Sequence, residues 1–491
     1  MSVSIACRKT IAWLAAGLLA GGCAVGPDYR RPPAVAASGG TPAAFKEQGD
    51  WKVGQPQDER ARGAWWAVFK DQQLDELERQ VAVSNENLKG AEAGFRQAYA
   101  LLDAARAGFS PTGTVGAGAQ RSGQGGIQGP PDGGMHTGSQ FDLNTGASWT
   151  LDLWGRIRRN VENAGDNAQA SVGDLASARL SAQGALAQAY YQLRTADQLA
   201  RLLEATVVAY ARALEITVNQ HNVGVVSRAD VAQAQAQLEG VRAQLMNVAI
   251  GRAQDEHAIA VLIGKPPTAF SLAKGADLGE VPAIPFVVPS ALLERRPDIA
   301  SAERRMAAAN AQIGVAISAY YPTLTLSASW DSTSATIGSL LRAANGLWSF
   351  GPQLAETVFD GGLRDAQVAQ ARAGYDQSVA TYRQTVLTAF QQVEDQLVAL
   401  RVLTEQATVQ ARAVSAADDA EQLILNQYKA GTVAYTSVVS AQTVALGDRQ
   451  SALVLKQQRL LAAVQLIQAL GGGWDPAELD ELPSDPAAAH P

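Results

Sequence analysis

The strongest constraint on the fold is a helical pattern that runs from Gly155 to about Asn222 without a proline, over roughly 67 residues. A helix of that length extends about 100 Å at 1.5 Å per residue. Apolar residues within it recur in alternating steps of three and four, which predicts a coiled-coil seam. The seam residues are Leu193, Ala196, Ala200, Leu203, Val207, Tyr210 and Leu214. Long paired helices are therefore expected rather than one thick globular core.

The sequence also contains two copies of one unit, 207 residues apart. The motif Asn219–Gly224 returns as Asn426–Gly431, and this register holds without a gap for about 110 residues. A period this long indicates a duplicated domain rather than a solenoid. The second copy of the seam is weaker, because Gln410 and Glu421 interrupt it.

Each copy places a strand pair between a shorter helix and a long one. Alternation of apolar and polar residues is clearest over Pro322–Ser334. The shorter helices are expected at Asp71–Gly108 and Pro297–Ala319, and the strands at about Pro111–Gln120, Gln140–Trp154, Pro322–Ser334 and Gly346–Phe359. Val231–Leu238 alternates with period two, but its alanines and glutamines favour a helix.

Aromatic residues lie near the strand ends: Trp149, Trp154, Trp330 and Trp348. Alternating strands with aromatic girdles are typical of a membrane β-barrel, although two soluble hairpins packed on the helices are an alternative. Four strands cannot close a membrane barrel, and open edges are not tolerated in lipid. A barrel would therefore need several chains in a symmetric oligomer.

The N-terminus is typical of a secretory signal that ends at a cysteine. Basic Arg8 and Lys9 precede the apolar run Ile11–Ala20, and Cys23 follows two glycines. This pattern is similar to the lipobox of bacterial lipoproteins, although Ala20 stands where Leu is usual. We expect residues 1–22 to be removed and Cys23 to carry lipid. The alternative is an ordinary signal or a buried helix, since the run is too short to span a membrane.

Composition argues against several functional classes. The net charge of −7 disfavours broad nucleic-acid binding. The four histidines, at positions 136, 221, 257 and 490, lack the spacing of a metal site. The Gly-rich stretch Gly123–Gly134 has no Gly-Lys-Ser/Thr and is not a phosphate loop. No enzymatic activity is expected.

Several motifs together resemble the TolC-like outer-membrane factor family, in particular the lipoprotein branch that serves RND-type efflux. They are Cys23–Tyr29, Trp65-Trp66, the linker Pro289–Ile299, and the turns at Asn222–Gly224 and Tyr428–Thr432. The resemblance implies a mainly α chain with a β membrane part. Three chains would share a 12-stranded outer-membrane β-barrel, continued by a long periplasmic α-helical barrel.

The expected organisation has six parts. They are a lipoprotein signal peptide (1–22), an acylated equatorial segment (23–70), a first repeat (71–264), an equatorial linker (265–296), a second repeat (297–471) and an acidic C-terminal tail (472–491).

The resemblance implies a passive exit channel for small molecules, such as drugs and toxic compounds, in the outer membrane of a Gram-negative bacterium. Its partners would be a periplasmic membrane-fusion adaptor and an inner-membrane RND-type transporter, with no cofactor besides the lipid on Cys23. Alternatives are the exit duct of a type I protein secretion system and a non-conducting periplasmic coiled-coil lipoprotein.

The resemblance also implies site residues. Adaptor-docking tips would be Val223, Gly224 and Val225 with Ala430, Gly431 and Thr432, and the aperture would include Arg228, Asp230, Tyr428, Ser437 and Ser440. Asp230 would accept a hydrogen bond from Tyr428 and hold the aperture closed, or cap its own helix. Ser437 and Ser440 replace aspartates that many relatives carry, which predicts weaker cation selectivity and weaker divalent-cation block.

Overall fold

The computed structural model describes residues 24–35, 42, 44–47, 63–124, 136–275, 277–282, 284 and 295–474. The predicted signal peptide, Cys23 and the acidic tail from Asp475 lie outside these residues. The chain divides into two compact units. The first takes residues up to Pro32 with Arg96–Ala170 and Ala302–Tyr382, and the second takes Pro33–Phe95, Ser171–Ser301 and Arg383 onward.

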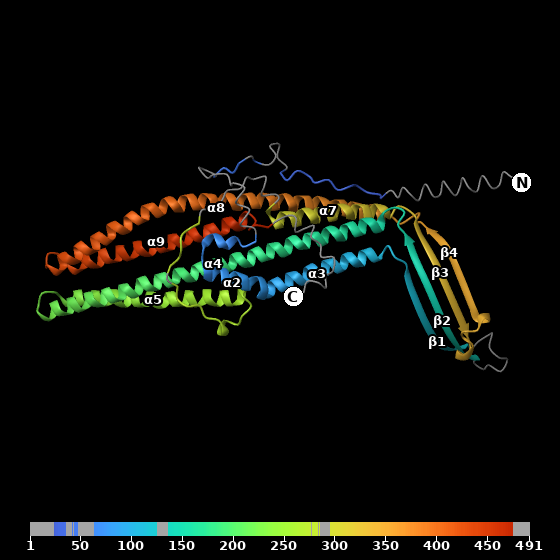
Figure 1. Ribbon diagram of the computed structural model, residues 1–491, viewed down its shortest axis with the longest axis horizontal. Coiled ribbons are helices and arrows are strands. Elements are labelled where there is room, and N and C mark those ends of the chain that lie inside the picture. Colours follow the sequence, from blue (N-terminus) through green and yellow to red (C-terminus); the bar gives the residue numbers. More distant parts are fainter. Residues whose placement is uncertain are drawn as a thin grey trace. The chain divides into compact units, whose positions relative to one another are not determined.

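The first unit contains one four-stranded antiparallel sheet (Figure 1). Its strands are β1 (Thr112–Gln124), β2 (His136–Leu151), β3 (Thr323–Ser334) and β4 (Gly346–Ala355), joined in the order β1-β2-β3-β4. The four predicted strands are confirmed, with shifts of several residues at some ends. Among the described residues β1 and β4 each pair with one strand only, so both edges of the sheet are open there.

Helical segments and an extended N-terminal segment complete the first unit. They come from α3 (Glu86–Ala107), α4 (Arg156–Asn222), α7 (Pro297–Ser318) and α8 (Leu363–Lys429). The buried guanidinium of Arg159 on α4 donates to the carbonyls of Val25 and Gly26 and pairs with Asp28 at 2.9 Å. The residues after Cys23 are thereby fixed to the helices of this unit.

The second unit contains two long helical hairpins. The first joins α4 to α5 (Arg228–Leu262), and the second joins α8 to α9 (Tyr435–Ala469). The predicted helix after Gly155 is confirmed, and so is the helix over the alternating stretch Val231–Leu238. Leu203 and Tyr210 of the predicted seam are buried against α5 and α9.

The two interruptions of the second seam are paired in the structure. Gln410 donates to the Asp448 carbonyl and carboxylate at 3.1 Å, and Glu421 accepts from Arg449 at 2.8 Å. Arg449 also pairs with Asp418 at 2.7 Å. At these two positions the second hairpin is therefore joined by polar and ionic contacts, whereas the matching Leu203 and Leu214 of the first hairpin pack against apolar side chains.

The helix predicted over Asp71–Gly108 is wrong as one element, because it breaks at Asn85. It forms α2 (Gln72–Ser84), which the Asp71 carboxylate caps, and α3. The Asn85 amide donates to the Leu262 carbonyl at the end of α5, while its oxygen accepts from the backbone N–H groups of Asn87 and Leu88. Asn85 thus links the end of one helix to the start of another.

A second junction joins the end of α9 to the start of α7. The buried Arg296 guanidinium donates to the Ala469 carbonyl at 2.9 Å and to Gln392 at 2.8 Å. At both junctions a glycine with positive φ lies too close to backbone for any Cβ: Gly264 against Ser84, and Gly471 against Arg295. Short 3₁₀ segments complete the fold: η2 (Trp65–Phe69), η3 (Pro267–Ala269), η4 (Ile337–Ser339) and η5 (Ala343–Asn345).

Candidate functional site: helix tips and strand sheet

The first hairpin turns at Gly224, which has φ of 78°. Its N–H donates to the His221 carbonyl, and the next N–H, of Val225, donates to the Gln220 carbonyl, both at 2.9 Å. The second turn repeats the pattern around Gly431, with φ of 74°. This way of ending a helix requires a left-handed residue, which glycine supplies without steric cost.

Both tips present their side chains to solvent. Val223 is 74% exposed and Val225 is 65% exposed, and a Cβ at either turn glycine would meet nothing within 4 Å. Ala430 and Thr432 of the second tip are exposed as well. The first tip therefore offers two apolar side chains that are mostly exposed to solvent.

Asp230 forms a capping box at the start of α5. Its carboxylate accepts from the backbone N–H of Ser227 at 3.0 Å and from the Ser227 hydroxyl at 2.8 Å, and the Ser227 side chain accepts from the Asp230 N–H. The capping role expected for Asp230 is therefore present. Arg228, also expected at the aperture, is exposed in the same turn.

The second hairpin has no such cap. Ala434 occupies the position that matches Ser227, and no side chain caps α9. Ser437 matches Asp230, and the Ser440 hydroxyl donates to the Thr436 carbonyl of its own helix at 3.0 Å. Neither serine brings a charge to this tip.

Tyr428 joins the two hairpins, but through a residue other than the expected one. Its hydroxyl donates to Thr217 on α4 at 3.3 Å, and its ring packs on Tyr435 with centroids 5.3 Å apart. In this conformation Asp230 bonds Ser227, so the described contacts contain no hydrogen bond between Asp230 and Tyr428.

Amide and hydroxyl contacts continue this interface along α5 and α9. Gln237 donates to Thr443 at 3.0 Å, and seven residues further along each helix Gln450 donates to Gln244 at 3.2 Å. The hydrogen bonds named here between the hairpins are all uncharged.

The sheet has one apolar and one polar face, because its register aligns the alternation of all four strands. Trp330 pairs with Trp348, and Leu326 lies between Trp149 and Pro352. The outer strands expose apolar side chains on this face most strongly within the chain, as Val115 of β1 is at 78% and Trp348 of β4 at 74%. The opposite face carries mainly Thr, Ser, Gln and Asn, with the acidic residues Asp142 and Asp331, and Leu347 at one end is an apolar exception.

The predicted girdle residues lie in two rows. Trp154 stacks on Tyr321 with centroids 4.9 Å apart and donates to the Pro322 carbonyl at 2.8 Å, and Trp149 donates to the Phe109 carbonyl at 2.8 Å. These residues lie where the strands meet the helices. Trp330 and Trp348 lie toward the other end, where η4 and η5 connect β3 to β4.

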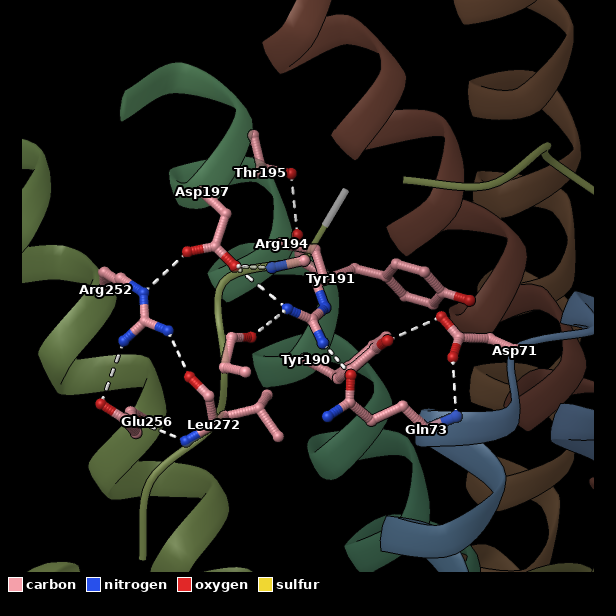
Figure 2. Close-up of polar contacts among 12 residues, drawn as sticks. Asp71, Gln73, Tyr190, Tyr191, Arg194, Thr195, Asp197, Arg252, Glu256 and Leu272 are labelled. Carbon is pink, nitrogen blue, oxygen red and sulfur yellow. Dashed lines mark hydrogen bonds and ion pairs between the residues drawn. The ribbon is translucent and has the colours of Figure 1, made fainter. Parts of the chain in front are cut away.

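A buried ionic network, which the sequence did not suggest, fixes the linker that follows α5. Figure 2 shows the fully buried Asp197 between Arg194, at 3.0 Å, and Arg252, at 2.7 Å. Arg252 also pairs with Glu256 at 3.1 Å and donates to the Leu272 carbonyl. In the sequence these residues are charged positions within helical patterns. Such positions usually lie on a solvated helix face, so the pattern did not indicate a buried network.

Glu78 on α2 is a buried carboxyl without a charge partner. Its side chain is fully buried, and neither oxygen has a hydrogen-bond partner among the described residues. Burial raises the pKa of Glu78 to about 9, because the anion would lose its hydration. The carboxyl is therefore neutral at physiological pH.

Among the described residues, no helix is long and apolar enough to cross a membrane. The same residues contain no group of three or more histidines, cysteines or carboxylates placed to hold a metal ion.

Comparison with known proteins gives one family along most of the chain. A profile of the outer membrane efflux protein family matches residues 77–265 and again residues 288–472. The toluene efflux pump outer membrane protein TtgC of Pseudomonas putida is 32% identical over 463 residues, covering 92% of this chain and 93% of TtgC.

Two solved structures share the fold. The outer-membrane channel OprN superposes with a TM-score of 0.83 at 28% identity, over 92% of this chain and 100% of OprN. CusC, solved in a study of transmembrane channel formation, superposes with a TM-score of 0.79 at 26% identity, over 92% of this chain and 100% of CusC. The family expected from the sequence motifs is confirmed: the chain belongs to the outer membrane efflux protein family.

Proposed function

We propose that this outer-membrane efflux protein is one subunit of a trimeric exit channel, which passively conducts small molecules to the cell exterior. The two-faced sheet carries the proposal, because apolar side chains on one face suit lipid and polar side chains on the other suit a water-filled lumen. Toluene is the compound named for the relative TtgC, and small apolar or amphipathic compounds are the class proposed here.

The open sheet edges support assembly of several chains. Because the four strands alternate in direction, β4 of one copy and β1 of the next would pair antiparallel. Three copies would give twelve strands, above the minimum of about eight for a membrane barrel. No strand edge would then remain open in lipid.

The spacing of the aromatic rows agrees with a membrane span. Tyr321 and Trp330 are nine residues apart, which is about 30 Å along a strand. At the usual tilt of about 40°, this corresponds to about 23 Å across the bilayer, close to the ~25 Å apolar band of outer-membrane barrels.

The hairpins would form the periplasmic tube, with their tips toward the partner proteins. A periplasmic adaptor would dock at Val223–Val225 and Ala430–Thr432, and an inner-membrane RND-type transporter would supply energy and choose the cargo. The exposed valines of the first tip support this role, since an apolar side chain in water gains by being covered. The duct itself would carry out no reaction and need no cofactor.

We also propose that Cys23 carries the lipid that anchors the mature chain. The first described residues after it are fixed by Arg159 rather than free. Mass spectrometry of the purified protein tests the modification. A mature N-terminal peptide that begins at Cys23 with acyl chains is expected, and an unmodified thiol would contradict it.

Single-channel recording in a planar bilayer tests the channel. Discrete conductance steps from a trimeric species are expected. Silence of both the wild type and an Asp230→Ala, Tyr428→Phe double variant would favour a non-conducting coiled-coil lipoprotein. Deletion of the gene should raise drug sensitivity; a loss of protein secretion with unchanged drug sensitivity would instead indicate a secretion duct.

A further inference from the structure

A cavity of about 410 Å³ lies between linker residues Gly279–Val281 and the hairpin of α8 and α9. Its apolar part is formed by small and aliphatic side chains, among them Val281, Ala411 and Leu455. Lys456 and Arg459 of α9 line it with positive charge. The cavity thus combines an apolar floor with two cations.

Arg459 has no partner for its charge among the described residues. Its Nε atom is buried and makes no hydrogen bond there. Glu280 also lines the cavity, yet it forms no ion pair with either cation in that part of the chain. Lys456 pairs with Asp277 at 3.5 Å, but the Asp277 side chain is 80% exposed. An ion pair so exposed contributes little.

A buried donor without an acceptor is costly, and more so when it belongs to a charged group. The cavity would therefore be stabilised by an occupant that brings carboxylates to Arg459 and apolar groups to the floor. The C-terminal tail has this chemistry. Between Asp475 and Asp485 it carries five acidic residues and two leucines, Leu479 and Leu482, and no basic residue.

We propose that the segment Asp475–Asp485 of this chain docks in the cavity, with its carboxylates on Arg459 and Lys456 and its leucines against the apolar floor. The docked tail would cover the linker where it crosses the second hairpin. This assignment concerns the tail alone and does not require the pore to conduct.

The tail is long enough to reach the cavity. Arg459 lies ten residues before the end of α9 at Ala469, which is about 15 Å along the helix axis. Trp474, the last described residue, follows a three-glycine turn at the end of that helix. Glu481 is seven residues further on, so an extended chain would carry it about 23 Å.

Photocross-linking of the full-length protein tests the docking. A benzophenone amino acid in place of Ser484 should link mainly to Ala407–Ala411 or Ala452–Arg459, as identified by mass spectrometry. Arg459→Gln should lower the yield about tenfold, because it removes a charged hydrogen-bonding group. Changing the five acidic residues to amides should have the same effect. Arg412→Gln, at an exposed site on the same hairpin, is the matched control and should leave the yield unchanged.

Three results would overturn the proposal. One is cross-links that fall mainly on other segments. Another is a yield that Arg459→Gln leaves unchanged, or that Arg412→Gln lowers equally. The third is cross-links between heavy and light copies in mixed, isotopically labelled trimers, because these would assign the tail to a neighbouring subunit. Cross-linking needs no conduction, so a silent channel would not affect the result.

Discussion

At the scale of single residues, Asp230 at the first tip and Glu78 on α2 show that the surroundings of a carboxyl group decide its role. Asp230 satisfies two donors of Ser227 and so stabilises a helix start. Glu78 has no such donors and stays neutral instead. The sequence shows two acidic residues in helices and does not separate these cases.

Glu78 makes stability fall as pH rises. The folded-state pKa is about 9 and the ordinary value is 4.5, so the folded chain holds a proton that the unfolded chain loses between these values. At pH 7 this difference lowers the free energy of unfolding by about 3 kcal/mol relative to its value at pH below 4. Thermal unfolding in detergent should show the melting temperature of wild type falling between pH 5 and 9, and Glu78→Gln should flatten this slope. Glu76→Gln, at an exposed site on α2, should keep it; parallel curves for all three proteins would refute the burial argument.

The two roles considered for Asp230 can be separated by a matched pair of variants. Ser227→Ala removes the cap while leaving the carboxylate, and should cost about 1 kcal/mol of stability. Asp230→Ala removes the carboxylate but leaves the Ser227 hydroxyl accepting from the backbone N–H of residue 230. If the carboxylate closes the aperture, this variant should also raise the resting conductance. Bilayer recording of the two variants decides this. Equal conductance in both would leave Asp230 with the cap alone.

At the scale of elements, the long helices and strands were predictable because their signals are local and periodic. The break at Asn85 was not, because its cause is the carbonyl of Leu262, which lies 177 residues away. The partners of Gln410 and Glu421 were hidden for the same reason: they lie on the returning helix. Motifs predicted that Tyr428 contacts the other hairpin, but not that its partner is Thr217. The adaptor-docking and aperture roles of the tip residues stay predictions.

The glycine at the first helix junction should tolerate no side chain. A Cβ at Gly264 would lie 2.1 Å from the Ser84 carbonyl oxygen, at a φ of 68°. Gly264→Ala should therefore lower stability by about 2 kcal/mol or more. Gly251→Ala, on α5 with open space around its Cβ, should be neutral or stabilising. Thermal unfolding of both variants provides the comparison, and equal melting temperatures would argue against a tight junction.

At the scale of the whole molecule, the proposed trimer multiplies every charge at the aperture by three. Ser437 stands where the second hairpin could carry a carboxylate, so the aperture should show weak cation selectivity and weak divalent-cation block. Ser437→Asp should shift the reversal potential in a salt gradient toward the cation value and strengthen block by divalent cations. Ser440→Thr, which keeps the hydroxyl, should change neither. Strong divalent block in the wild type would contradict the prediction.

The second unit contains both ionic and uncharged contacts, and the two kinds should respond differently to the salt concentration of the medium. Within the second hairpin, Arg449 holds Asp418 and Glu421 by charge, and dissolved ions screen such pairs. Between the hairpins, Tyr428 meets Thr217 and Gln237 meets Thr443 without any charge. A rise in external salt should therefore soften one hairpin internally while leaving the seal between hairpins as tight as before. In the proposed channel, the resistance of the closed tip to opening should then be the same in dilute and in saline medium.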